Sequence, residues 1–334
     1  MTCCAPHTAP SMTGPLVIAH RGACAYLPEH TLEAKALAYA QGADYLEQDL
    51  VMSRDGHLVV LHDIHLDEVT DVAEHYPDRA RPDGRYYAID FTLAEIRTLR
   101  AVERFARETG GAVFPGRFPA ATGNFRLHTF AEEVTLIQGL NRSTGGQVGL
   151  YPEIKRPAWH RSQGKDPSVR LLEELAGFAY TDEQSAVFVQ CFDPAELRRI
   201  RHELGSRLPL IQLIADNAWG EADTDYDLLR TPAGLSEIAT YAQGIGPHWS
   251  HLIEGLNSDG SPRLTGLAEA AHAAGLLVHP YTARREQIPF GIADIDAWVR
   301  LLYAQVRVDG LFIDSPDDAS RVLRALAAEP RPAA

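Results

Sequence analysis

The sequence predicts an α/β fold, namely a parallel (β/α)8 or TIM barrel with a small inserted subdomain. From about residue 149 onward, short apolar runs alternate with segments of helical periodicity, which is typical of β-α units around a parallel sheet. Polar and charged residues also stand at or near the ends of five apolar runs. Barrel enzymes build their active sites at the carboxyl ends of the strands, so both observations favour the same fold.

Nine apolar runs are strand candidates, and most are rich in leucine or β-branched residues, as expected of strands covered on both faces. A barrel needs eight, so one candidate is in excess. The sequence Arg-Asp-Gly at 54–56 indicates where, because a short Asp-Gly connection typically makes an antiparallel hairpin. The candidates are 16–20, 45–52, 58–62, 149–154, 186–191, 208–214, 243–246, 276–279 and 310–314.

Helices are predicted between these strands. Thr129 followed by Glu132 forms a capping box. Pro194, Pro232 and Pro316 suit the first turns of three other helices. The predicted helices are 31–41, 129–140, 166–179, 194–204, 232–243, 265–274, 294–306 and 316–327.

We expect a single barrel domain over residues 14–330, with flexible termini at 1–13 and 331–334. Residues 64–128 break the alternation of strands and helices. They are rich in charge and tyrosine, and only 92–108 has a helical pattern. These residues are therefore predicted to form an insertion, which suits a lid or specificity element as well as a subdomain without a functional role.

The composition is that of an ordinary globular protein, with 334 residues and a formal net charge of −14. This charge argues against broad nucleic-acid binding and against an anionic membrane surface. An anionic substrate would need local positive charge from arginine, lysine or a bound cation. No apolar run is long enough to span a bilayer, so we expect no stable membrane insertion.

The N-terminal residues lack the basic and apolar regions of a secretory leader, so the sequence as given indicates a cytoplasmic protein. Removal of an upstream leader would make it periplasmic instead. The four cysteines show no zinc-binding spacing and are expected to be free thiols. A disulfide between Cys24 and Cys191 would require both to line the same rim of the barrel.

Three carboxylates point to a metal site. Glu47 and Asp49 share one face of a predicted strand because side chains alternate along a strand, and Glu153 ends another strand. Carboxylates that face the same way repel one another unless a positive group lies between them. Oxygen ligands without cysteine or histidine at metal spacing favour a hard cation, Ca²⁺ or Mg²⁺. The alternative is a barrel interior in which Arg21 and Lys155 form salt bridges to these acids.

Two histidines and two basic side chains also stand at or near the ends of predicted strands and would suit a phosphate ester. His20 and His62 end predicted strands and could divide the acid and base roles on opposite sides of a phosphate. Arg21 could grip two phosphate oxygens, and Lys155, on the same strand face as Glu153, could neutralise the charge that develops in the transition state.

The remaining strand-end residues are weaker candidates. Gln190 and Phe192 are expected to shape the pocket, and His279, Tyr281 and Asp314 are expected at the barrel rim. Four other histidines lack this context and are expected on the surface; they are His75, His160, His202 and His272.

The chain resembles the glycerophosphodiester phosphodiesterases, and specifically the periplasmic-type bacterial branch. The matching segments run in family order from about residue 16 to 325, so the resemblance covers nearly the whole chain. They are VIAHRGACAYLPEHT, GADYLEQDLVMSRDG, LVVLHDIHLDEVTDV, PDGRYYAIDFTLAEI, GLYPEIKRP, VQCFD, GIGP, LVHPYTAR and DGLFIDSPD.

The resemblance implies a phosphodiesterase-type TIM barrel with an insertion. It implies one divalent cation, Ca²⁺ in this branch, at Glu47, Asp49 and Glu153, with Arg21 and Lys155 on the phosphate. His20 and His62 would be the acid–base pair. Substrates of the family include glycerophosphocholine and glycerophosphoethanolamine, and the products are glycerol 3-phosphate and an alcohol. In the wider superfamily a substrate hydroxyl is thought to attack phosphorus, which gives a cyclic phosphate that water opens.

Two alternatives stay open from the residues. One is a phospholipase D-like or cyclising lyase barrel that acts on intact lipids and would need an exposed apolar rim. The other is a non-catalytic surface binding protein on the same fold. A pure binder would not need His20, His62 and the three carboxylates together.

Overall fold

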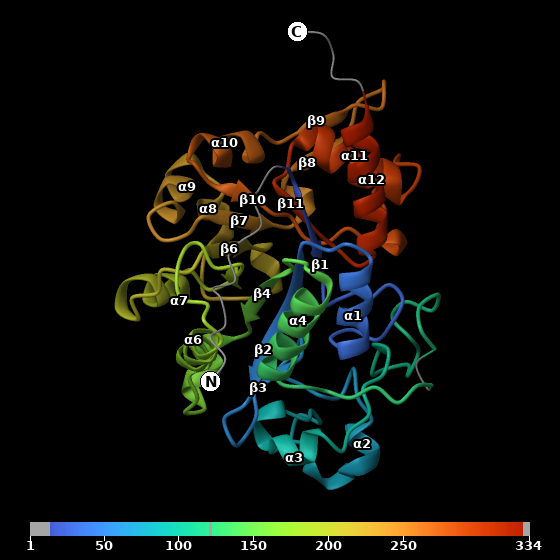
Figure 1. Ribbon diagram of the computed structural model, residues 1–334, viewed down its shortest axis with the longest axis vertical. Coiled ribbons are helices and arrows are strands. Elements are labelled where there is room, and N and C mark those ends of the chain that lie inside the picture. The colour runs from blue at the N-terminus through green and yellow to red at the C-terminus, as the bar shows by residue number, and fades with distance from the viewer. Residues whose placement is uncertain (1–13, 120–121, 330–334) are drawn as a thin grey trace.

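The computed structural model describes residues 14–119 and 122–329 (Figure 1). The expectation of flexible termini at 1–13 and 331–334 therefore lies outside the described residues, as do Cys3 and Cys4.

Eight parallel strands form a nearly closed barrel, which confirms the predicted fold class. The sheet closes through β10 and the segment that follows it. There, the Asp309 amide donates to the Val278 carbonyl (3.0 Å), and Phe312 exchanges backbone bonds with Pro280 and Ala283 (3.0 and 2.9 Å). In sheet order the strands are β10 (Leu277–Val278), β7 (Gly244–Pro247), β6 (Leu210–Ile214), β5 (Val189–Cys191), β4 (Gly149–Ile154), β2 (Tyr45–Met52), β1 (Leu16–Ala19) and β11 (Gly310–Ile313).

The excess strand is β3 (Leu58–Val60), which pairs antiparallel with the end of β2 and lies outside the barrel path. The predicted Asp-Gly hairpin is thus confirmed. Gly56 has φ +85°, a left-handed conformation that favours glycine in this tight connection. The Leu61 amide then donates to the Asp49 carbonyl (2.9 Å), so the hairpin returns the chain to the barrel rim just before His62.

Helices follow most barrel strands and surround the barrel (Figure 1). The capping box of Thr129 and Glu132 is present, and Pro194, Pro232 and Pro316 lie in first turns, as predicted. Two helices, α7 (Pro194–Arg198) and α11 (Ile295–Leu301), continue as the π-helical turns η3 (Arg199–Glu203) and η7 (Leu302–Val306). The others are α1 (Leu32–Ala40), α4 (Phe130–Thr144), α5 (Pro157–Ser162), α6 (Pro167–Gly177), α8 (Tyr226–Leu229), α9 (Pro232–Ile238), α10 (Leu267–Ala273) and α12 (Pro316–Ala328).

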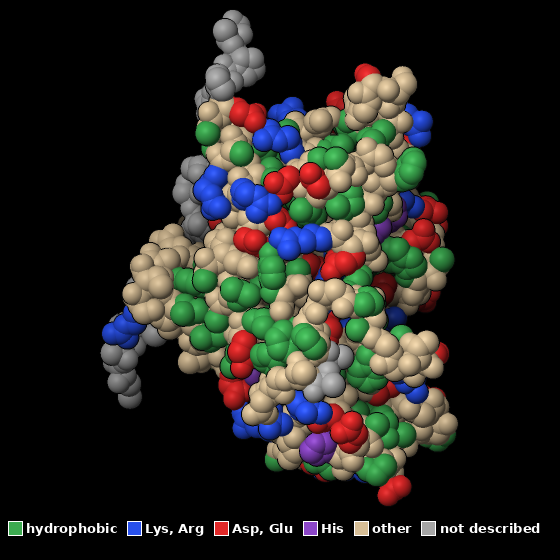
Figure 2. All heavy atoms as spheres, turned by 90° about the vertical axis from the view of Figure 1, so that its right-hand side faces the viewer, with side chains coloured by type: hydrophobic (Ala, Val, Ile, Leu, Met, Phe, Trp, Pro, Cys, Tyr) green, Lys and Arg blue, Asp and Glu red, His purple; other side chains and the backbone are tan. Residues whose placement is uncertain are grey.

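A two-stranded hairpin of β8 (Ile253–Leu256) and β9 (Pro262–Leu264) follows β7 and was not predicted. Among the described residues, no helix combines the length and apolar character needed to cross a bilayer. On the face shown in Figure 2, acidic and basic side chains are interspersed, so the net negative charge does not segregate there.

Residues 64–119 and 122–128 pack at one end of the molecule, beyond β2 and β3 (Figure 1). Their buried apolar side chains, among them Leu66 and Phe91, form a separate cluster with Val51, Val59 and Leu61. Their helices are short: α2 (Val72–His75), α3 (Leu93–Ile96), η1 (Pro77–Arg79) and η2 (Ala88–Asp90).

The predicted helix over 92–108 is wrong, because only Leu93–Ile96 is helical. Beyond it, Ala101 forms antiparallel bridges with both Thr70 and Phe125. The Arg100 amide donates to the Asp71 carboxylate (2.7 Å). These tertiary bonds take the backbone groups that a longer helix would have used.

Two histidine predictions also need correction. His160 is fully buried: its Nε2 accepts from the Met52 amide (3.1 Å), and its Nδ1 bonds the Lys155 carbonyl (3.0 Å), which joins the ends of β2 and β4. His279 lies inside the barrel and not at its rim, where it bonds the Tyr151 hydroxyl (2.8 Å). His75, His202 and His272 are exposed, as expected.

A buried charge network supports β2 from outside the barrel. The Lys35 ammonium lies 2.9 Å from the Glu133 carboxylate and also donates to the Glu47 carbonyl. Glu133 further bonds Gln48 (2.8 Å) and His128 (2.8 Å). Both Lys35 and Glu133 are fully buried, so each charge depends on the other.

We therefore expect Lys35→Met to lower the free energy of unfolding by about 3–5 kcal/mol, because Glu133 would keep a buried charge with its cation removed. Denaturant unfolding measures this loss. Lys165→Met, at a lysine whose contact is on the surface, should change stability by about 0.5 kcal/mol or less. The double variant Lys35→Met/Glu133→Gln should recover much of the loss, and a single variant as stable as wild type would contradict the role of the network.

Candidate active site

Three carboxylates gather at the carboxyl ends of β2 and β4. The register pairs Asp49 with Glu153, and Glu47 lies two residues earlier on the same face of β2. Each of the three offers an oxygen within 4.8 Å of the others, and all three are buried. The structure thus brings together all three predicted metal ligands.

The charges of these acids are unequal. Burial raises the pKa of Glu47 to about 8, and the Asp49 charge adds to the rise. Burial also raises the pKa of Glu153, against the opposing pull of Lys155. Burial acts upward on Asp49 too, but Lys155, His62 and His30 outweigh it and hold the pKa of Asp49 well below its usual range.

The carboxylate set fits a cation. Asp49 Oδ1 is buried and has no hydrogen-bond partner among the described residues; Lys155 Nζ is 3.9 Å away from it. A buried carboxylate oxygen without a partner is costly, and a hard cation would satisfy it. The chain therefore has a group of acidic side chains that could hold a divalent metal.

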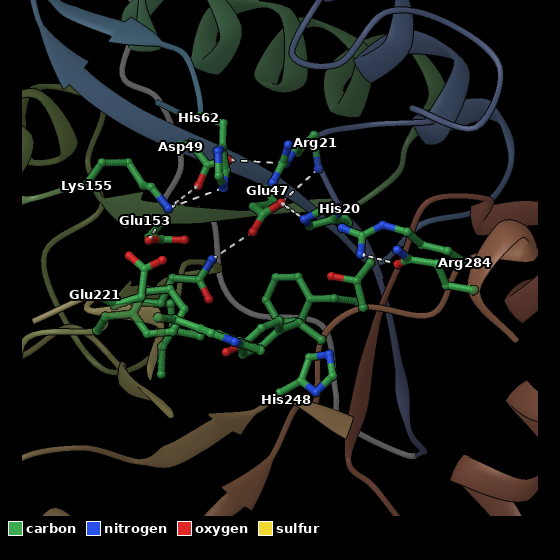
Figure 3. A pocket seen from close by; sticks show the side chains of 18 residues that line it. His20, Arg21, Glu47, Asp49, His62, Glu153, Lys155, Glu221, His248 and Arg284 are labelled. Carbon is green, nitrogen blue, oxygen red and sulfur yellow. Dashed lines mark hydrogen bonds and ion pairs between the residues drawn. The ribbon is translucent and has the colours of Figure 1, made fainter. Parts of the chain in front are cut away.

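The two predicted catalytic histidines face this group (Figure 3). His20 follows β1; its Nδ1 bonds Asp314 Oδ1 (2.6 Å), and its Nε2 is 3.8 Å from Glu47. His62 follows the β3 hairpin; its Nδ1 bonds Asp63 Oδ1 (2.8 Å), and its Nε2 is 3.5 Å from Lys155 Nζ. Burial lowers the pKa of His20 to about 3 and that of His62 to about 4.

Arg21 and Lys155 bring positive charge to the same cavity. The Arg21 amide donates to Glu47 Oε2 (2.8 Å), while its guanidinium bonds Glu29 (3.0 Å). Gly22 lets the chain turn here: it has φ +90°, and an added Cβ would lie 2.9 Å from the Ala34 carbonyl carbon. Lys155 Nζ lies 2.8 Å from Glu153.

The weaker candidates also line the cavity, which has a volume of about 320 Å³. Gln190 donates to Glu47 Oε1 (3.0 Å). Phe192 and Tyr281 meet edge to face (5.8 Å between ring centres), and the Lys155 ammonium is 5.7 Å from the Phe192 ring. Trp219, Glu221, His248 and Arg284 also line this cavity and were not predicted.

One contact to a predicted metal ligand was not expected from the sequence. His30 is buried and bonds Asp49 Oδ2 (2.7 Å). It stands directly before Thr31, the N-cap of α1, and not at a strand end. Its place inside the PEHT segment is the one signal that could have marked it.

Cys24 and Cys191 are both buried and free, so the disulfide between them is not formed. The Cys24 thiol donates to the His20 carbonyl (3.1 Å), and the Cys191 thiol to the Ile154 carbonyl (3.4 Å).

A parallel barrel with three carboxylates, two histidines and two basic side chains at its rim defines a phosphodiesterase-type barrel enzyme. The chain belongs to the glycerophosphoryl diester phosphodiesterase family, whose model matches residues 20–318. The predicted resemblance to this family is thereby confirmed, whereas its periplasmic-type branch stays a prediction.

Two relatives are named glycerophosphodiester phosphodiesterase. The one from Haemophilus influenzae is 43% identical over 93% of this chain and 90% of its own length. The one from Treponema pallidum is 40% identical over 90% of each. A solved structure of an Oleispira antarctica phosphodiesterase in complex with the product sn-glycerol-3-phosphate shares the fold, with a TM-score of 0.61, 19% identity and coverage of 93% of this chain and 97% of that one.

A second cavity of about 230 Å³ adjoins the site on the side of the insertion and shares His20, Arg21, His62 and Arg284 with it. Glu103 lines this cavity. Its side chain is 4% exposed, and its Oε2 has no hydrogen-bond partner among the described residues. Burial raises the pKa of Glu103 to about 8; Glu29 and Asp314 add to the rise, and Arg117 and Arg104 oppose it.

We expect Glu103→Gln to stabilise the protein more as the pH rises from about 4.5 to about 8. In this window the unfolded chain releases the Glu103 proton while the folded chain keeps it, so wild-type stability falls with pH, and glutamine removes that fall. Melting temperatures of both proteins across pH 5–9 measure the difference. Exposed Glu108→Gln is the control, and a Glu103→Gln advantage that did not grow with pH would contradict the expectation.

Proposed function

We propose that this enzyme hydrolyses glycerophosphodiesters, such as glycerophosphocholine and glycerophosphoethanolamine, to glycerol 3-phosphate and an alcohol, with the help of one divalent cation. The observation that carries the proposal is the joint placement of the carboxylates Glu47, Asp49 and Glu153 with the Nε2 atoms of His20 and His62 on one cavity.

In this proposal Glu47, Asp49 and Glu153 hold the cation. An all-oxygen set of buried ligands suits Ca²⁺, our choice, and also Mg²⁺. When bound, the ion would act as a Lewis acid on a phosphate oxygen.

Arg21 and Lys155 would bind the phosphodiester. Arg21 lines the cavity, and its guanidinium is held by Glu29 (3.0 Å) and lies 3.7 Å from Asp49, so a positive charge is kept beside the carboxylates. Lys155 Nζ lies between Glu153 and His62, at the edge of the same cavity. The Arg21 guanidinium and the Lys155 ammonium are already held by carboxylates, so binding the phosphate requires little reorganisation.

The histidines would divide the proton transfers. Each Nδ1 bonds an aspartate and leaves Nε2 toward the cavity. One neutral imidazole would take the proton of the substrate hydroxyl that attacks phosphorus. The other, protonated, would give its proton to the alcohol oxygen as the phosphorus–oxygen bond breaks. Water would then open the cyclic phosphate with the two roles reversed.

Removal of the cation should abolish turnover. After dialysis against a chelator, we expect loss of glycerol 3-phosphate release from glycerophosphocholine, a lower melting temperature, and recovery of both with Ca²⁺. Glu153→Gln should lose the metal by elemental analysis, whereas Glu221→Gln, on the same cavity wall, should keep it. Full activity in metal-free protein would exclude the cation from the reaction.

Loss of either histidine should slow the chemical steps. We expect His20→Ala and His62→Ala to lower kcat by about 10²–10⁴-fold, because each acid or base role contributes on that order. Steady-state rates on glycerophosphocholine with saturating Ca²⁺ measure this, and surface variant His75→Ala should match wild type. Wild-type rates in either active-site variant would disprove its assignment.

A further inference from the structure

Two arginines of the insertion reach the barrel rim, and each donates to an aspartate that also bonds a histidine. Arg117 Nη2 donates to Asp314 Oδ2 (2.6 Å), while Asp314 Oδ1 bonds His20 Nδ1 (2.6 Å). One carboxylate oxygen thus serves the arginine and the other serves the histidine.

The second contact repeats this arrangement. Arg104 Nη1 donates to Asp63 Oδ2 (2.7 Å), while Asp63 Oδ1 bonds His62 Nδ1 (2.8 Å). Arg104 also grips both oxygens of Glu29 (2.7 and 3.0 Å), and Glu29 accepts from Arg21 (3.0 Å). Residues far apart in the chain are joined, since Arg117 and Asp314 are 197 positions apart.

We propose that the insertion is a positioning element of the active site, in which Arg104 and Arg117 orient His62 and His20 through Asp63 and Asp314. The inference rests on the proposed function for the roles of the two histidines, and it adds residues outside the barrel that set their geometry.

The physical basis is the fixed orientation of each aspartate. A carboxylate on Nδ1 keeps the proton on that nitrogen and leaves Nε2 free, provided that the carboxylate itself cannot rotate. A charge-assisted bond from a guanidinium to the second oxygen prevents that rotation. The Nε2 atoms of His20 and His62 are thereby kept toward Glu47 and Lys155 (Figure 3).

Burial indicates that the contact to Asp314 persists in solution. The side chains of Arg117 and Asp314 are 5% and 2% exposed, so water competes little for either group. Arg284, on the loop after β10, also donates to Asp314 Oδ2 (3.0 Å), so Asp314 keeps one arginine if Arg117 is lost. Asp63 has Arg104 as its one arginine partner among the described residues.

Other arginines of the insertion provide a matched control. Arg126 donates to the carbonyls of Thr98 and Leu99 (both 3.0 Å). Within the described part of the chain it makes no hydrogen bond or ion pair to His20, His62, Asp63 or Asp314. Its loss tests whether any weakening of the insertion slows the enzyme.

The experiment compares Arg117→Met, Arg117→Lys, Arg104→Met and Arg126→Met in the Ca²⁺-loaded full chain, with kcat, KM and melting temperature measured for each. We expect Arg117→Met to lower kcat about 10-fold or more with little change in KM, as removal of an outer hydrogen-bond partner commonly does. Lysine at 117 should restore part of kcat. Arg104→Met should lower kcat further and raise KM, because it also releases Glu29 and Arg21. Arg126→Met should keep both constants.

A double-mutant cycle shows whether Arg117 acts through Asp314. In an Asp314→Asn background, we expect Arg117→Met to cause little further loss of kcat. Fully additive losses, or an equal loss in Arg126→Met, would overturn the proposal. If a variant is too unstable for kinetics, the NMR resonance of the His20 Nδ1–H proton takes the place of the rates. We expect this resonance in wild type and expect it to shift in Arg117→Lys. Its absence from wild type, or an unchanged position in Arg117→Lys, would overturn the proposal.

These outcomes separate this inference from the proposed function. Wild-type kinetics in Arg117→Met together with an inactive His20→Ala would overturn the positioning role and leave the catalytic assignment intact. Wild-type kinetics in His20→Ala would overturn the catalytic assignment itself.

Discussion

The main constraint on the site is electrostatic repulsion, because three carboxylates are buried within a few ångströms of one another. Several polar contacts reduce this repulsion: the side chains of Lys155 and Arg21 supply positive charge, and His30 bonds Asp49. The compensation is incomplete. Burial raises the pKa of Glu47 and Glu153, whereas Lys155, His62 and His30 lower that of Asp49, so the two glutamates hold their protons more tightly than the aspartate. A cation bound among the three acids would offset the repulsion that remains.

Strand register brings residues that are distant in the sequence together in this site. β1 pairs with β11 so that Ala19 lies opposite Ile313, and the next residue on each strand is His20 or Asp314. β2 pairs with β4 so that Asp49 faces Glu153, and Glu153 in turn faces Gln190 on β5. His62 reaches the site by a different route, through the antiparallel hairpin that leaves the barrel and returns. The barrel thus supplies the acids and one histidine, whereas an excursion from it supplies the other.

The sequence was informative where one local pattern decides the structure. Alternation along 45–52 placed Glu47 and Asp49 on one face, the Asp-Gly pair indicated the hairpin, and Thr129 marked a helix start. It failed where tertiary contacts decide. The helical pattern over 92–108 gave way to backbone bridges from Ala101 to Thr70 and Phe125. His160 is buried and accepts from the Met52 amide, a contact between residues far apart in the chain. The partners of Arg104 and Arg117 follow no spacing rule, since only the folded chain brings them together.

The two buried thiols affect how the folded site responds to oxidants and alkylating reagents. Burial raises the pKa of both Cys24 and Cys191. The thiolate that such reagents attack is therefore disfavoured at both positions. The Cys24 thiol donates to the His20 carbonyl, so its sulfur is held against the backbone of a predicted catalytic histidine. Oxidants should therefore modify these two sulfurs only slowly while the protein stays folded.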